Sequence, residues 1–222
     1  MDYEEKNMII DNFRINGHGK IFIIAEIGMN HNGLYDKAIE LIDIAIKAGA
    51  DCVKFQMRCL EELYSQDALD VSKGDLSTQY TIGLLRKFEL SYDEYKKLAK
   101  YCHDNNIIFL CTPWDIKSAD LIEKIGVSAY KVASADMTNY ALLDHLCEKG
   151  KPLILSTGMS KKSEIDNVVK YLNSKKKKVK FALLHCNSTY PAPFKDINLN
   201  YLKTMSEYDI PIGYSGHERG IA

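Results

Sequence analysis

The chain contains 222 residues, of which 46% are apolar and 27% are charged. This composition is typical of one globular domain with a sizeable core, and it argues against a disordered chain. Because 29 Lys and Arg residues almost balance 30 Asp and Glu residues, the formal net charge is -1, which favours neither nucleic acid nor an anionic membrane as a partner.

The amino terminus and the cysteines indicate the compartment. Residues 1–16 are mixed and charged, without an apolar core of signal-peptide length, and no later run approaches the roughly 18 apolar residues of a membrane span. The six cysteines would allow three disulfides, but none forms a CxxC pair, and a chain with its own core does not need that framework. We therefore expect a cytoplasmic protein with reduced, structural thiols and no membrane partner.

Short apolar runs rich in β-branched and aromatic residues alternate with segments of helical periodicity. In chain order, the expected elements are strand 21–27, helix 38–46, strand 52–56, an interruption at 58–88, helix 91–105, strand 107–112, helix 117–125, strand 129–134, helix 141–148, strand 152–157, helix 161–172, strand 181–186, helix 198–206 and strand 211–214. The interruption is too long for a simple loop, and its charged pattern predicts short helices that form a flap. The lysine run 175–178 lies between a helix and a strand, which favours a solvated loop over a nucleic-acid site.

Alternating strands and helices predict parallel strands joined by crossovers, in either an open doubly wound sheet or a closed barrel. The GxGxxG fingerprint and the P-loop are absent from the sequence. Polar residues follow almost every strand, as a barrel mouth requires, so we expect an α/β fold of the TIM (β/α)8 type. Such barrels typically need about 250 residues. We therefore expect a barrel truncated after its seventh strand.

Two lysines, Lys54 and Lys131, lie in or near the carboxyl ends of expected strands. A lysine in this position serves as a Schiff-base nucleophile, an anion ligand or an ion-pair partner. Two cations in one cavity suit a small dianion or trianion better than a carbonyl that needs one amine. Neutral donors would come from the hydroxyls of Thr112, Ser134, Ser156 and Ser215. The alternative is that the lysines only pair with carboxylates, such as Glu26 and Asp136.

Glu26 and His217 are the remaining candidates for chemistry. Glu26 ends an apolar run, so its carboxylate should emerge where the strand ends. It is either a salt-bridged structural acid or a catalytic, water-orienting group, and the polar segment 30–33 beside it favours the second. His217 follows the seventh expected strand, where a neutral imidazole would suit a divalent metal, although one histidine is weak evidence.

Seven blocks occur in the same order as in the sialic acid synthase family, whose members condense phosphoenolpyruvate with an N-acetylated amino sugar. They are 22–33 (FIIAEIGMNHNG), 48–56 (AGADCVKFQ), 111–115 (CTPWD), 130–139 (YKVASADMTN), 155–159 (LSTGM), 184–191 (LHCNSTYP) and 213–217 (GYSGH). From residue 21 onward the chain therefore resembles this family.

The resemblance implies a (β/α)8 barrel and a set of site residues. Phosphoenolpyruvate would be held by positions that match Lys54, Thr112, Lys131, Ser134, Ser156 and Ser215. The sugar would face Gln56, Asp136, Ser188 and Tyr190. His217 matches a ligand of a divalent metal, Mn2+ or Mg2+, and the second histidine ligand belongs to the family's eighth strand, for which this chain has no residue.

The resemblance also implies a reaction. The metal polarises the aldehyde of the open-chain sugar, C3 of phosphoenolpyruvate attacks C1, and water adds at C2. Cleavage of the C–O bond then releases phosphate and leaves a nonulosonic acid. Glu26 matches the glutamate that manages protons and water at this step. The sugar would be N-acetylmannosamine or a 2,4-diacetamido-trideoxyhexose.

Departures from the family pattern suggest a subgroup. Asp136 stands where glutamate is usual, and Gly216 replaces an aspartate. The family pattern also expects a polar contact two positions before Tyr190. The register favours Ser188 for it over Asn187. A relative of sialic acid, such as legionaminic acid, is a possible product. Two other hypotheses of function remain open, namely a Schiff-base aldolase that uses Lys131 and a noncatalytic barrel fragment.

The resemblance also implies a homodimer, in which a carboxyl-terminal antifreeze-like domain reaches the partner's active site. We expect residues 1–222 to form one incomplete synthase barrel without that domain, aggregation-prone and poorly active alone, because the first and seventh strands would have unpaired edges.

Overall fold

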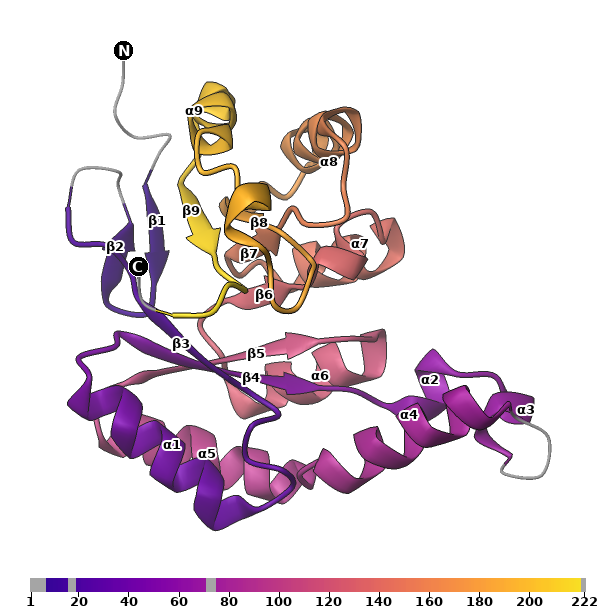
Figure 1. Ribbon diagram of the computed structural model, residues 1–222. Coiled ribbons are helices and arrows are strands. Elements are labelled where there is room, and N and C mark those ends of the chain that lie inside the picture. The colour runs from indigo at the N-terminus through magenta and orange to yellow at the C-terminus, as the bar shows by residue number, and fades with distance from the viewer. Residues whose placement is uncertain (1–6, 16–18, 71–74, 221–222) are drawn as a thin grey trace. The chain divides into compact units, whose positions relative to one another are not determined.

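The computed structural model describes residues 7–15, 19–70 and 75–220. Its contacts divide the chain into two compact units (Figure 1). One unit is residues 22–128, and the other is residues 129–222 together with the amino-terminal 21 residues. We call them the 22–128 unit and the 129–222 unit.

The 22–128 unit is built on a three-stranded parallel sheet of β3 (Ile24–Gly28), β4 (Cys52–Met57) and β5 (Ile108–Pro113), in that order. Its helices are α1 (Tyr35–Lys47), α5 (Tyr92–Asp104) and α6 (Ile116–Ile125), and α1 and α5 lie side by side against the sheet (Figure 1). Helix α1 buries Ala38, Ile42 and Ala45, a helical spacing that turns one apolar face to the strands. Strand β4 is the central strand of this sheet and is buried almost throughout, which explains its mostly apolar sequence.

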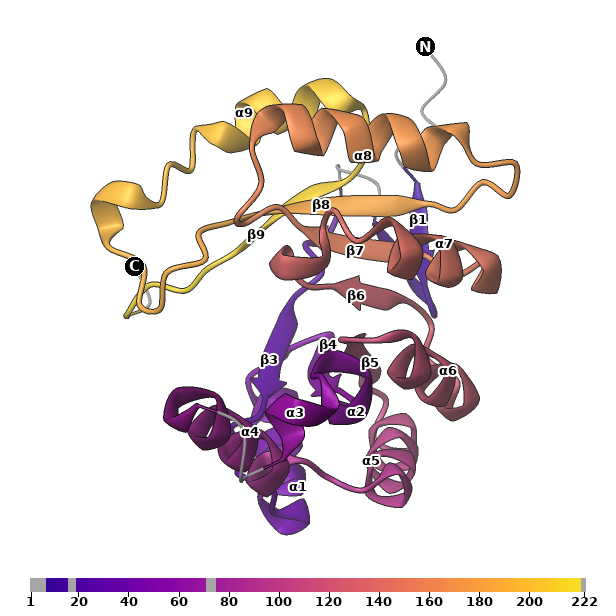
Figure 2. The ribbon, with the colours of Figure 1, turned by 90° about the vertical axis from the view of Figure 1, so that its right-hand side faces the viewer.

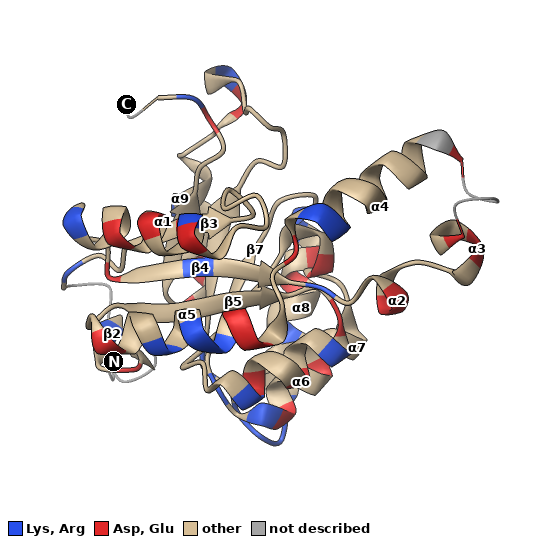
Figure 3. Cartoon of the chain, turned by 90° about the horizontal axis from the view of Figure 1, so that it is seen from below, with Lys and Arg blue, Asp and Glu red and all other residues tan. Residues whose placement is uncertain are grey.

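Residues 58–88 form α2 (Leu60–Leu63), α3 (Gln66–Leu69) and α4 (Leu76–Phe88). Ser65 caps α3, and Asp75 caps α4 by accepting hydrogen bonds from two backbone amides. The prediction of helices here is confirmed, although α4 has 13 residues and is not short. Figures 1 and 3 show these helices projecting beyond the carboxyl end of β4.

The 129–222 unit contains a four-stranded parallel sheet of β6 (Tyr130–Val132), β7 (Leu153–Ser156), β8 (Phe181–Cys186) and β9 (Ile212–Ser215). Its helices are α7 (Tyr140–Lys149), α8 (Lys162–Ser174) and α9 (Tyr201–Met205), with 3-10 turns η1 (Ser134–Asp136), η2 (Phe194–Asp196) and η3 (Ser206–Tyr208). Figure 2 shows α8 and α9 running along one side of β8 and β9.

A hairpin of β1 (Met8–Ile10) and β2 (Phe13–Ile15) precedes these sheets and is antiparallel. Met8 and Ile10 are buried, whereas Ile9 between them is exposed. This hairpin was not predicted, because strands of three residues are too short to show a reliable alternation.

All seven expected strands are present, and the α/β class with parallel strands is confirmed. In the part of the chain that the structure describes, they form two parallel sheets, of three and four strands, and not one hydrogen-bonded sheet of seven. The closed barrel and its truncation stay predictions. Within the described ranges, no helix is both long and apolar enough to span a membrane. All six cysteines are free thiols, as expected.

The lysine run 175–178 differs from a purely solvated loop. The Lys175 ammonium lies 2.5 Å from a carboxylate oxygen of Asp144 and 3.9 Å from the centre of the Tyr171 ring. Lys177 donates to the backbone carbonyl of Glu148 at 2.6 Å. Two of the four lysines therefore link the end of α8 to α7.

Candidate active site

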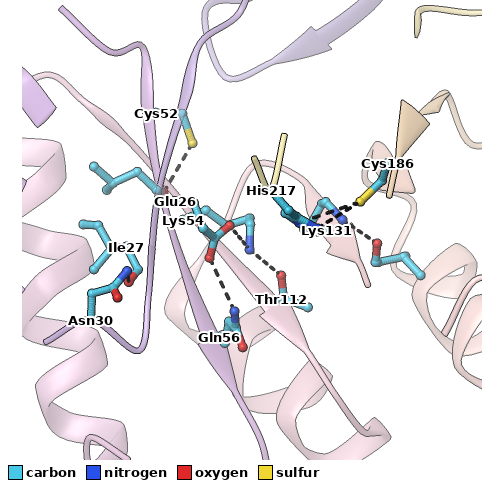
Figure 4. A network of polar contacts seen from close by, with 12 residues as sticks. Glu26, Ile27, Asn30, Cys52, Lys54, Gln56, Thr112, Lys131, Cys186 and His217 are labelled. Atoms are coloured by element: carbon cyan, nitrogen blue, oxygen red, sulfur yellow. Dashed lines mark hydrogen bonds and ion pairs between the residues drawn. The ribbon is translucent and has the colours of Figure 1, made fainter. Parts of the chain in front are cut away.

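Three predicted site residues meet on adjacent strands of the 22–128 unit (Figure 4). The Lys54 Nζ on β4 lies 2.6 Å from Glu26 Oε2 on β3 and donates to Thr112 Oγ1 on β5 at 2.9 Å. The parallel register places Glu26 directly opposite Lys54. In Figure 3, β4 carries one blue band and β5 is tan, because Lys54 is the one charged residue in these two strands.

Burial makes this ion pair asymmetric. The Lys54 side chain is 8% exposed, whereas the Glu26 side chain is 50% exposed. An ammonium taken out of water needs a partner, which Glu26 provides. Ion pairing between Lys54 and Glu26, one of the two readings of the sequence, is therefore present in the structure. The Thr112 hydroxyl accepts from Lys54, so its own proton remains available for a ligand.

Gln56 extends this cluster along β4. Its Nε2 lies 3.4 Å from Glu26 Oε1, and its Oε1 accepts a hydrogen bond of 2.7 Å from Arg58 Nη2. Arg58 was not among the predicted site residues, because it lies beyond the strand end and no sequence pattern singles it out.

The segment 30–33 after β3 contains a buried histidine. His31 is fully buried, its Nδ1 accepts from the Gly33 amide at 3.1 Å, and its Nε2 has no hydrogen-bond partner within the described part of the chain. Burial lowers the pKa of His31, which favours the neutral imidazole. This histidine packs 5.9 Å from the Phe55 ring and belongs to the core beneath the site.

In the 129–222 unit, two predicted hydroxyls meet at a glycine. A Cβ added to Gly158 would lie 2.3 Å from Ser188 Oγ and 2.7 Å from Ser134 Oγ, so only glycine allows this close approach. The Ser188 hydroxyl is buried and makes no hydrogen bond to any residue that the structure describes. A buried hydroxyl without a partner is costly, and a polar ligand would satisfy it.

The other polar strand ends of this unit are also buried or half-buried. Lys131 on β6 is 6% exposed and donates to the Val132 carbonyl at 2.6 Å. Asp136 in η1 is buried and accepts from the Asn139 side chain at 3.0 Å. Ser156 is buried at the end of β7, and Ser215 ends β9, opposite Cys186 of β8.

His217 lies in a compact polar cluster after β9 (Figure 4). Its Nε2 is 2.8 Å from the Tyr190 hydroxyl, and the two rings stack with centroids 3.9 Å apart. Its Nδ1 contacts the Asn187 carbonyl, and Cys186 Sγ lies 3.7 Å from both ring nitrogens. Because a carbonyl only accepts, Nδ1 must carry a proton, and in the neutral tautomer the lone pair is then on Nε2.

This tautomer suits a single metal ligand, because metal-binding histidines usually donate their other N–H to a carbonyl or carboxylate. Among residues 7–15, 19–70 and 75–220, no three His, Cys, Asp or Glu side chains are grouped as a complete metal site. The predicted metal role of His217 thus fits one coordination position.

The sequence is similar to those of several known proteins. An uncharacterized protein of Methanocaldococcus jannaschii is 44% identical over 201 residues, which cover 90% of this chain and 56% of that protein. The N,N'-diacetyllegionaminic acid synthase of Campylobacter jejuni is 36% identical over 207 residues, which cover 91% of this chain and 62% of the synthase. The chain therefore spans less than two thirds of the length of these relatives.

The fold is also found among solved structures. The crystal structure of N-acetylneuraminic acid (sialic acid) synthetase from Leptospira borgpetersenii, in complex with citrate, has a TM-score of 0.87 and 35% sequence identity. The match covers 98% of this chain and 72% of the synthetase. In sequence, residues 41–222 match the model of the NeuB family. The chain therefore belongs to the NeuB family.

Proposed function

We propose that the chain condenses phosphoenolpyruvate with an N-acetylated amino sugar, giving a nonulosonic acid and phosphate. The observation that carries this proposal is the buried Lys54 ammonium, which Glu26 and Thr112 hold at the ends of adjacent strands. Such a cation binds a phosphate or carboxylate, and the half-exposed Glu26 is available for proton transfer. The names of the similar proteins, a diacetyllegionaminic acid synthase and an N-acetylneuraminic acid synthetase, support the same class of product.

The proposed binding roles follow the chemistry of each side chain. The anionic groups of phosphoenolpyruvate would be bound by two cations and four hydroxyls, from Lys54, Lys131, Thr112, Ser134, Ser156 and Ser215. The hydroxyl and acetamido groups of the sugar would be bound by Gln56, Asp136, Ser188 and Tyr190. Assigning residues of both units to one reaction rests on family membership.

Glu26 is the proposed general base. Its carboxylate would take a proton from the water that adds to C2, after C3 of phosphoenolpyruvate has bonded to C1 of the sugar. The C2–O bond to phosphate then breaks, which leaves a ketone at C2 and releases inorganic phosphate. Lys54, 2.6 Å away, would balance the negative charge that leaves with the phosphate.

His217 is the proposed ligand for a divalent metal, Mn2+ or Mg2+, through Nε2. When bound, such a metal would polarise the sugar aldehyde as a Lewis acid. Tyr190 would have to release the Nε2 atom that its hydroxyl contacts in the structure. Assembly as a homodimer, which the family resemblance implies, remains a further prediction.

The test is phosphate release from phosphoenolpyruvate in the presence of manganese, with a panel of N-acetylated amino sugars. The proposal expects release only when a suitable sugar is present, with a product mass equal to sugar plus pyruvate. Borohydride trapping of pyruvate on Lys131, without phosphate release, would contradict it and support the Schiff-base aldolase.

A further inference from the structure

Arg58 contacts the carboxyl ends of all three strands of the 22–128 sheet. Its Nη2 donates to Gln56 Oε1 on β4 at 2.7 Å, and its Nη1 points to the sulfur of Met29, just beyond β3. Its guanidinium lies 4.7 Å from the centre of the Trp114 ring, the residue that follows β5. One side chain therefore spans the strand ends beside the proposed site.

The Arg58 contact determines which way the Gln56 amide faces. A guanidinium only donates hydrogen bonds, so Gln56 must present Oε1 to Arg58 and Nε2 to the other side. On that other side, Nε2 lies 3.4 Å from Glu26 Oε1, a long and weak contact. The short charge-assisted bond from Arg58 is therefore the stronger constraint on the amide.

Arg58 is itself held in place. Its guanidinium stacks on Trp114, and its backbone amide lies 3.4 Å from Glu89 Oε1. Burial lowers the pKa of Arg58, but a guanidinium stays charged at any physiological pH. Arg58, Arg86 and Glu89 help to line a pocket of about 310 Å³.

We infer that Arg58 is a positioning residue for the amino sugar, because it holds Gln56 with its amide NH2 turned toward Glu26 and the substrate. The inference rests on the proposed function, in which Gln56 faces the sugar. Arg58 acts through Gln56 and has no role toward phosphoenolpyruvate.

The test is a double-mutant cycle of Arg58→Met and Gln56→Ala. Arg58→Met should raise the KM for the amino sugar about tenfold, as loss of a charged hydrogen bond implies, and leave the KM for phosphoenolpyruvate unchanged. In the Gln56→Ala background the same substitution should add almost nothing. Arg58→Lys should restore part of the loss, and Arg86→Met, on the same pocket, should have no effect. An equal rise in both KM values, or the full effect of Arg58→Met without Gln56, would overturn the inference.

A second readout does not depend on turnover. The side-chain amide of Gln56, assigned by its disappearance in Gln56→Ala, should shift or broaden in the 15N NMR spectrum of Arg58→Met while the backbone spectrum is otherwise retained. An unchanged amide signal would refute the positioning role, whatever the activity. Failure of the wild-type chain to use any amino sugar would instead refute the proposed function.

Discussion

Replacement of Glu26 by Gln separates the structural role of this side chain from its proposed catalytic role. The substitution keeps the shape and one acceptor oxygen, but it removes the charge that pairs with Lys54 at 2.6 Å. Breaking a fully buried pair costs about 3–5 kcal/mol, and an exposed pair contributes about 0–1 kcal/mol. Because Lys54 is buried and Glu26 is half-exposed, we expect a loss of about 1 kcal/mol, or a fall in Tm of about 2–4 °C.

Turnover should fall far more than stability. A general base contributes about 100- to 10,000-fold to the rate, so Glu26→Gln should lower kcat at least about 100-fold. Binding of phosphoenolpyruvate, measured as thermal stabilisation of the variant, should be nearly intact because Lys54 and Thr112 remain. Asp43→Asn is the matched control. It removes a carboxylate on α1 that accepts a hydrogen bond of 2.7 Å from the Tyr101 hydroxyl on α5, away from the strand ends. Near-normal phosphate release by Glu26→Gln would refute the catalytic role.

Two further predictions concern the 129–222 unit. Gly158→Ala would place a Cβ 2.3 Å from the Ser188 hydroxyl. It should destabilise the chain by about 1–3 kcal/mol and weaken substrate binding measured by calorimetry. The control Gly83→Ala, which has open space around it, should do neither. Equal loss of stability in the two variants would contradict the steric argument. The hydrogen bond from Lys175 lowers the pKa of Asp144 in the folded chain. The ionised carboxylate therefore stabilises the fold fully at pH values above its unfolded pKa of about 3.9. This stabilisation is lost as the pH falls through the lower folded pKa. Asp144→Asn should therefore flatten the acid dependence of urea unfolding, and an unchanged pH slope would count against this pairing.

The parallel strands were predictable because buried strands have a strong local signature. The run in β4 is apolar except for Lys54 and Gln56, and both exceptions were predicted as site residues. The meeting of candidate residues at strand ends, such as Glu26 and Thr112 beside Lys54, was predictable because parallel strands align their carboxyl ends at one edge.

Features that depend on loop conformation were not predictable. Arg58 reaches Gln56, Met29 and Trp114 only because three separate strand ends bring those residues together. The closeness of Gly158 to Ser188 likewise depends on how two loops fold. Glycine is needed there for space, because an added Cβ would lie 2.3 Å from the Ser188 hydroxyl. The short β1–β2 hairpin has too few residues for a periodic signal.

The fate of the bridging oxygen of phosphoenolpyruvate tests the proposed reaction most directly. With 18O between C2 and phosphorus, condensation by C–O cleavage should place the label in the released phosphate and yield a keto acid whose nine-carbon backbone is built from both substrates. Label retained in pyruvate or in the keto acid would mean cleavage of the P–O bond, and phosphate released without the amino sugar would mean hydrolysis without condensation. Either result would contradict the account.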